Sequence, residues 1–144
     1  MKKLITIICF GILFFSSCKK SDVSSTSIVG TWELRGAQYG MTPGNQYGPG
    51  NGNLFKFSVL TYQKYKDGNL IKSGQYKLVH DPSAEAEVGL VIPAGQFTNR
   101  IVFDHDYSSQ KTFIQISDNR LSFLSGYFPT DGGSGESYQR IDSN

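Results

Sequence analysis

Asp104, His105 and Asp106 place two carboxylates and an imidazole next to one another, side chains that serve in metal ligation and general-base catalysis. The same run lies where two predicted strands must reverse direction, and aspartate is a common turn residue. The other histidine, His80, precedes Asp81 at a predicted strand end, and the two histidines lack the spacing of a zinc motif. No Gly-x-Ser-x-Gly or phosphate-loop sequence occurs. We therefore favour a turn at residues 104–106, and we expect no enzymatic activity, no metal and no cofactor.

Cys18 follows two serines at the end of a short apolar segment. The chain opens Met1-Lys2-Lys3, and residues 4–15 are apolar except for Thr6 and Gly11. This order is typical of a secretory signal, and about twelve apolar residues are too few to span a bilayer core. The segment resembles the lipobox of bacterial lipoproteins, which implies that residues 1–17 are removed and that Cys18 is acylated. The alternative is a secreted protein with a free thiol at Cys18, an unfavourable group in an oxidising compartment.

Removal of residues 1–17 changes the charge and the cysteine count. Loss of Lys2 and Lys3 reduces the fourteen basic side chains to twelve, which equals the twelve acidic ones. A neutral chain without a basic run argues against nucleic-acid binding. Cys9 is lost as well, so no disulfide is available. Residues 18–27 are polar and predict a flexible tether after the lipid, and residues 28–144 have the length of one domain.

The domain alternates apolar and polar residues at period two, and no long window has helical periodicity. The pattern predicts strands at 29–38, 53–66, 69–79, 100–103, 111–117, 120–127 and 136–141, with a candidate short strand at 89–92. Hairpin turns are predicted at Asp67-Gly68 and Asp118-Asn119. A meander of this kind hides its edges by closing on itself. We predict an all-β fold, a small antiparallel up-and-down β-barrel of seven or eight strands.

An eight-stranded barrel is wide enough either to fill with side chains or to hold one small ligand. The alternation predicts that bulky side chains point inward, and their bulk favours filling. In the loop at 80–88, the pattern indicates that Asp81, Glu85 and Glu87 are solvated charges. The predicted inward residues are Phe55, Phe57, Val59, Tyr76, Leu78, Ile101, Phe103, Ile114, Ile116, Leu121 and Phe123.

Several short motifs, in this order, resemble lipocalins and their small bacterial lipocalin-like (calycin-type) relatives over residues 28–142. They are Gly30-Thr31-Trp32, Phe55-Lys56-Phe57, Asp67-Gly68, Gly74-Gln75-Tyr76 and Tyr138-Gln139-Arg140. The resemblance implies that Trp32 closes one end of the barrel and that Arg140 packs over its ring, so Gly30, Trp32 and Arg140 are expected to be structural. The domain is shorter than a typical lipocalin and lacks the usual helix beside the barrel, which argues against a deep cavity.

Residues 39–53 are rich in glycine and proline and predict a long loop between the first two strands. In the family that this chain resembles, the corresponding loop lies across the open barrel mouth. Tyr39, Met41 and Tyr47 are therefore our candidate ligand-binding residues. The alternative is a connector whose tyrosines contact nothing.

These observations lead to one expected function and one rival. We expect a lipid-anchored binding module of the cell envelope, held to the membrane through Cys18, with a small hydrophobic ligand or a peptide at the barrel mouth. The rival is a structural lipoprotein with a filled barrel that docks another envelope protein. The family resemblance favours the outer membrane as its location.

Overall fold

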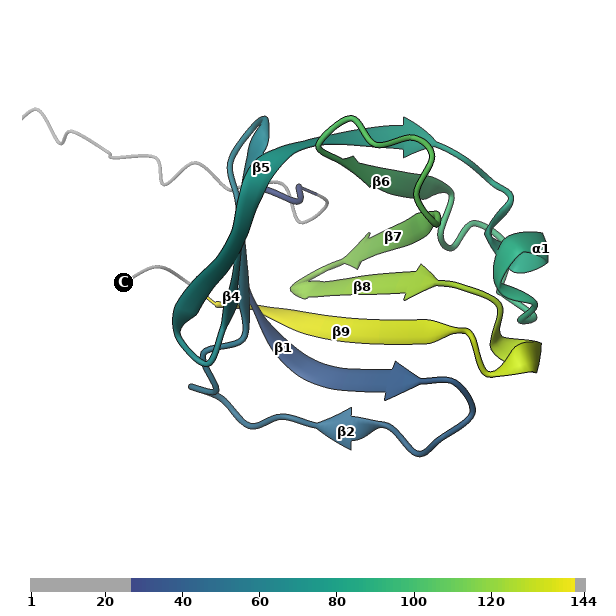
Figure 1. The fold of residues 1–144 in the computed structure, drawn as a ribbon, viewed down its shortest axis with the longest axis horizontal. Coiled ribbons are helices and arrows are strands. Elements are labelled where there is room, and N and C mark those ends of the chain that lie inside the picture. Colours follow the sequence, from purple (N-terminus) through teal and green to yellow (C-terminus); the bar gives the residue numbers. More distant parts are fainter. Residues whose placement is uncertain (1–26, 142–144) are drawn as a thin grey trace, which may run out of the picture.

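A computed structural model describes residues 27–141 of the chain. The predicted signal segment, Cys18 and the tether up to residue 26 lie outside the described residues. One antiparallel sheet dominates the fold (Figure 1). Its elements are β1 (Gly30–Tyr39), β2 (Asn45–Gln46), β3 (Leu54–Phe57), β4 (Thr61–Lys66), β5 (Asn69–His80), α1 (Ala84–Val88), β6 (Asn99–Phe103), β7 (Thr112–Ser117), β8 (Arg120–Ser125), η1 (Phe128–Thr130) and β9 (Ser134–Ile141).

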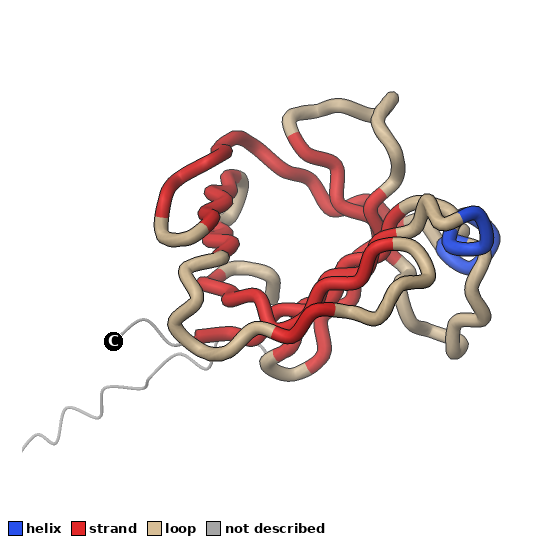
Figure 2. Tube along the Cα trace, turned by 60° about the horizontal axis from the view of Figure 1, so that its bottom comes forward, coloured by secondary structure: helices blue, strands red, loops and turns tan. Residues whose placement is uncertain are grey.

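The sheet closes because β1 pairs with β9 as well as with β3. This seam runs from the pair Thr31 and Ile141 to the pair Tyr39 and Ser134, with a β-bulge at Arg35. Figure 2 shows the strands, in red, surrounding a common interior. Eight strands form the closed barrel, and β2 is an additional strand. The predicted all-β, antiparallel barrel is therefore confirmed.

Strand β2 uses the same edge of β1 as β3 does. Gly36 of β1 pairs with Gln46, whereas Glu33 of the same strand pairs with Leu54 of β3. The side-chain amide of Asn51 also donates to the carbonyl of Leu34 at 2.9 Å. The segment predicted as a loop at 39–53 is thus partly a strand, because backbone pairing with β1 satisfies its polar groups.

Residues 53–66, predicted as one strand, form β3 and β4 with a turn between them. The amide of Ser58 donates to the carbonyl of Thr61 and closes this turn. Val59 lies at its tip and is exposed, so the prediction that Val59 points inward is wrong. Leu78 is also exposed, so the prediction that it points inward is wrong as well. Strand β4 pairs with β5 only as far as Gln75, and beyond that residue β5 has a neighbouring strand along one edge only, which is β6.

The connection between β5 and β6 folds back onto the outer wall of the barrel, where α1 lies outside the ring of strands (Figures 1 and 2). Gly89 ends the helix in a left-handed conformation, and a strand at 89–92 does not form. A Cβ at Gly89 would clash with the ring of Tyr127, so this close approach requires glycine. The helix also buries Ala84 and Val88 in a second apolar cluster, which they form with Phe97, Phe113 and Phe128.

Candidate functional site

One end of the barrel is closed by Trp32, which is fully buried. Its indole nitrogen donates to the carbonyl of Ile28 at 2.7 Å. The guanidinium carbon of Arg140 lies 4.1 Å from the Trp32 ring centroid, and Nη1 of Arg140 donates to the carbonyl of Val29 at 2.7 Å. A Cβ on Gly30 would lie 2.6 Å from that nitrogen, so the glycine provides space for the guanidinium. We name Gly30, Trp32 and Arg140 the plug.

Above the plug the interior is packed with aromatic rings. The ring of Phe55 lies at the centre, with its centroid 5.3 Å from that of Phe57 and 6.1 Å from that of Phe103. Phe123 and Tyr138 contact the same ring edge-on at 5.6 and 5.5 Å. Such offset and edge-to-face pairs are favourable arrangements of aromatic rings. The lower barrel is therefore a core, and space for a ligand has to be sought at the opposite end.

That opposite end, the mouth, contains two adjoining hollows of about 310 and 200 Å³. Lys64 and Glu136 line both of them. The larger is also lined by Tyr39, Tyr47 and Tyr138, and the smaller reaches down to Phe55, Phe103 and Phe123. The larger hollow is lined by Lys66 and Asp67 as well, so the mouth combines an aromatic floor with two cations and two anions at its wall. An apolar pocket with a few polar groups is the composition of a small-molecule site.

Glu136 is the acceptor of two tyrosine hydroxyls at the mouth. The hydroxyl of Tyr138 donates to Oε2 at 2.7 Å, and that of Tyr39 donates to Oε1 at 3.3 Å. Burial, followed by the charge of Glu136, raises the pKa of both tyrosines, and that of Tyr138 strongly. Both phenols therefore remain protonated hydrogen-bond donors at neutral pH.

Lys64 is the cation that lines both hollows of the mouth. Its Nζ lies 5.0 Å from the centroid of the Phe55 ring, a cation–π distance. Among residues 27–141, no carboxylate lies within ion-pair distance of this ammonium group and no oxygen accepts a hydrogen bond from it. An ammonium group carries three donors, so Lys64 can supply them to a ligand in the mouth.

The predicted ligand-binding residues lie in two places. Tyr39 and Tyr47 line the same hollow at the mouth, whereas Met41 lies outside it. The amide of Met41 donates to Oδ1 of Asp131 at 3.2 Å, beside a wide, shallow hollow of about 640 Å³ on the outer surface. We do not regard this hollow as a binding site, because three of its eight lining residues are glycines and it lacks the aromatic floor of the mouth.

Sequence reasoning missed Lys64 and Glu136, although the alternation contained a signal for both. Each stands two residues from an inward tyrosine on its strand, Tyr62 on β4 and Tyr138 on β9. Side chains two apart in a strand share a face. A polar residue in phase with buried aromatic residues is therefore a candidate for an interior site.

Asp104, His105 and Asp106 form the turn that the sequence predicts. The carboxylate of Asp104 accepts from the Tyr62 hydroxyl at 2.9 Å and pairs with Lys72 at 3.3 Å. Oδ1 of Asp106 accepts backbone amides of the following turn. Across the described part of the chain, no three or more His, Cys, Asp or Glu side chains are grouped so that they could hold a metal ion.

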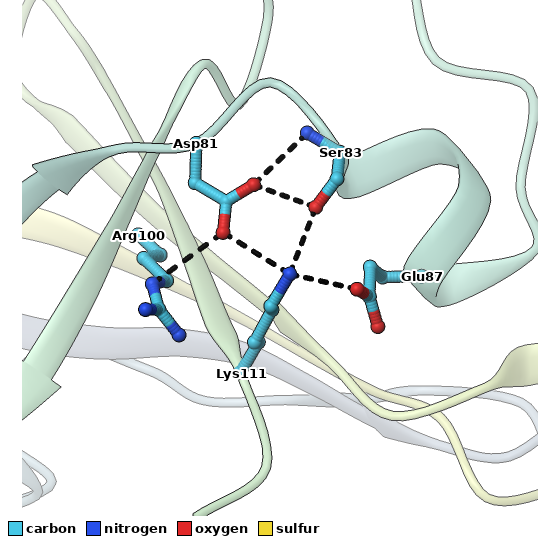
Figure 3. Close-up of polar contacts among 5 residues, drawn as sticks. All are labelled: Asp81, Ser83, Glu87, Arg100 and Lys111. Carbon is cyan, nitrogen blue, oxygen red and sulfur yellow. Dashed lines mark hydrogen bonds and ion pairs between the residues drawn. The ribbon is translucent and has the colours of Figure 1, made fainter. Parts of the chain in front are cut away.

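A second polar cluster lies on the outer wall beside α1 (Figure 3). Nζ of Lys111 contacts Glu87 at 2.7 Å, Ser83 at 3.1 Å and Asp81 at 3.2 Å. Asp81 also pairs with Nε of Arg100 at 3.4 Å. The expectation that Asp81 and Glu87 are merely solvated is therefore wrong, because the helix turn brings them to the same lysine.

The chemistry of this outer cluster is that of an ion-pair network. Hydrogen bonds from Ser83 lower the pKa of Asp81, and Glu87 raises the pKa of Lys111. Both shifts favour the charged forms, whereas general-base catalysis needs a group that exchanges protons near neutral pH. The cluster attaches the β5–β6 connection to the barrel.

No helix among residues 27–141 is long and apolar enough to cross a membrane. Comparisons of the chain with protein-family models, with curated proteins and with solved structures found no match.

Proposed function

We propose that this protein is a lipid-anchored binding module of the bacterial cell envelope that holds a small amphipathic ligand at its barrel mouth. The observation that carries the proposal is the pair of hollows above the aromatic core, which together offer about 510 Å³. This space falls within the range of small-molecule sites. The lipid anchor, the signal segment and the outer-membrane location are proposed from the lipobox resemblance at Cys18.

The ligand is an apolar body with an anionic head group. Phe55, Phe103 and Phe123 form the floor against which the apolar part packs. Lys64 stands at the wall with donors that no described residue occupies, and a carboxylate would accept from them. Glu136 is less available for a ligand because two tyrosine hydroxyls already donate to its oxygens.

The packed interior favours a second candidate function. A barrel filled by aromatic rings can serve as a rigid body that docks a peptide or another envelope protein through its loops. Under this alternative the mouth hollows are gaps between loops, and no small molecule competes for them. The two candidates differ in whether a discrete ligand stabilises the protein.

The ligand experiment compares three probes with the same alkyl chain and different head groups: decanoate, decanol and decylamine. With the unlipidated chain from residue 19, we expect decanoate to raise Tm most and to bind tightest in calorimetry. Lys64→Met should remove the preference for decanoate over decanol, because it deletes the ammonium and keeps an apolar stem. Lys77→Met, at an exposed position of β5 that lines neither hollow, is the matched control.

Two outcomes would contradict the ligand proposal. Tighter binding of decylamine would assign the site to Glu136 instead of Lys64. Absence of binding by all three probes, with native mass spectrometry of the chain isolated from cells giving a bare mass, would favour the docking alternative.

The anchor is tested separately from the ligand. Metabolic labelling with an alkyne fatty acid should mark the wild-type chain and the variant Cys9→Ser, but not Cys18→Ser. These two residues are the only cysteines of the chain, which makes Cys9 the matched control. Labelling that survives Cys18→Ser would refute lipidation at this residue.

A further inference from the structure

The turn between β3 and β4 presents apolar side chains to solvent. Val59 is 77 % exposed and Leu60 is 68 % exposed. The two-residue turns at Asp67-Gly68 and Asp118-Asn119 instead carry the polar and glycine residues that tight turns usually have. Neither Val59 nor Leu60 contributes to the core, so both side chains are available to contact an apolar surface.

This turn is held firmly by its neighbours. The amide of Ser58 donates to the carbonyl of Thr61 at 2.9 Å, and the hydroxyl of Tyr76 donates to the carbonyl of Ser58 at 2.7 Å. The amide of Tyr76 donates to the carbonyl of Leu60 at 3.1 Å. The backbone is therefore fixed from two strands, and the apolar side chains are presented outward from a rigid support.

The start of the described chain lies at the same end of the barrel as the turn. Gly30 pairs with Phe57, so the residues before Gly30 and those after Phe57 lie beside one another at the plug. The carbonyl of Ser27 accepts from Nη2 of Arg140, which attaches the chain at this point. Eight residues lie between Cys18 and Ser27, which makes nine Cα–Cα steps. At no more than about 3.6 Å per residue, they reach at most about 32 Å.

We infer that the β3–β4 turn, through Val59 and Leu60, contacts the lipid surface to which Cys18 is attached. The inference rests on the proposed acylation of Cys18. An acyl anchor keeps Ser27 within about 32 Å of the bilayer, and the apolar turn beside Ser27 then meets the interface, where exposed apolar side chains are favourably buried. Strand β1 leads from the plug to Tyr39 at the mouth, so the mouth faces away from the membrane.

The experiment supplies the anchor chemically, so its result does not depend on acylation in cells. The chain from Cys18 onward is coupled through its single thiol to a maleimide lipid in vesicles of phosphatidylethanolamine and phosphatidylglycerol. Val59→Trp and Val91→Trp are compared, because Val91 is 94 % exposed and comes three residues after the end of α1. Figure 1 shows α1 away from the purple start of the described chain. Wild type, whose only tryptophan is the buried Trp32, gives the background.

Brominated lipids then report which face meets the bilayer. Interfacial side chains lie about 5–10 Å into the head-group boundary, so bromines on the acyl chains should at least halve the emission of Val59→Trp. Emission of Val91→Trp and of wild type should be unchanged. Equal quenching of both variants, or quenching of Val91→Trp alone, would overturn the inference, as would an unquenched Val59→Trp. A negative result here, together with labelled Cys18 in cells, would leave the anchor intact and reject only the contact.

Discussion

Trp32 and Arg140 are cross-strand partners on the seam that closes the barrel, with the guanidinium carbon 4.1 Å from the indole centroid. One residue comes from the first barrel strand and the other from the last. The guanidinium also donates hydrogen bonds to the carbonyls of Ser27 and Val29. A single side chain therefore joins both ends of the domain, and its planar fork is the feature that the geometry uses.

Arg140→Lys should destabilise the domain although it preserves the charge. Lysine loses the fork that bonds two carbonyls and the flat stacking on the indole. Hydrogen bonds to charged groups contribute about 1.5–3 kcal/mol, so we expect a loss of about 2 kcal/mol in the free energy of unfolding. Denaturant unfolding followed by Trp32 fluorescence measures it. Arg120→Lys, at an exposed position, should be neutral, and equal effects of the two changes would contradict the plug.

Gly74→Ala should act through Asp104. A Cβ at Gly74 would clash with Oδ1 of Asp104, the carboxylate that accepts from the hydroxyl of Tyr62. The flexible carboxylate must move away, and the loss of this bond costs about 1.5–3 kcal/mol. In an Asp104→Ala background, the same glycine change should cost less than about 1 kcal/mol, because the two sites couple. Chemical unfolding of both single variants and the double variant gives this coupling. Losses in the free energy of unfolding that simply add up in the double variant would disprove it.

Phe55→Ala should report on the packed interior. The Phe55 ring contacts five other aromatic rings, and truncation of a buried phenylalanine typically costs about 3–5 kcal/mol. We expect a Tm reduced by more than ten degrees, with Tyr107→Ala, a change at an exposed tyrosine, near wild type. Calorimetry measures both. A mild effect of Phe55→Ala would mean that the interior collapses around the gap.

Asp81 should make the stability of the outer wall depend on pH. Its pKa is lowered in the folded state, so the unfolded chain takes up the proton more readily as the pH falls. The stabilisation is then fully present at neutral pH and is lost as the pH falls below the ordinary value of 3.8. Asp81→Asn should cost about 1–3 kcal/mol at pH 7, with the difference from wild type shrinking in acid. A difference that is constant with pH would contradict the ion-pair assignment.

The fold could be predicted from the sequence because alternation, hairpin turns and a single apolar face all favour a closed meander. The errors lie where long-range packing decides. Val59 has the phase of an inward residue, yet the chain turns there. Residues 84–88 carry too short a pattern to indicate a helix, and that helix forms because Ala84 and Val88 bury against Phe113 and Phe128 on the wall.

The candidate site was predictable only in part. Tyr39 and Tyr47 were identified from a loop that the family resemblance places over the mouth. Lys64 and Glu136 were not, because an isolated charge in an exposed-looking strand is usually solvated, and only the closure of the sheet turns both side chains toward one space. Met41 belongs to the same loop, but the hydrogen bond from its backbone amide to the carboxylate of Asp131 holds that residue on the outside.

The pairing of Thr31 with Ile141 has a consequence for how this domain can be joined to other chains. Its two ends leave from adjacent positions, so the whole unit can be inserted into a surface loop of a host protein without separating the host's own strands. The same adjacency permits new termini at the Asp67-Gly68 hairpin when a short linker bridges the old ones.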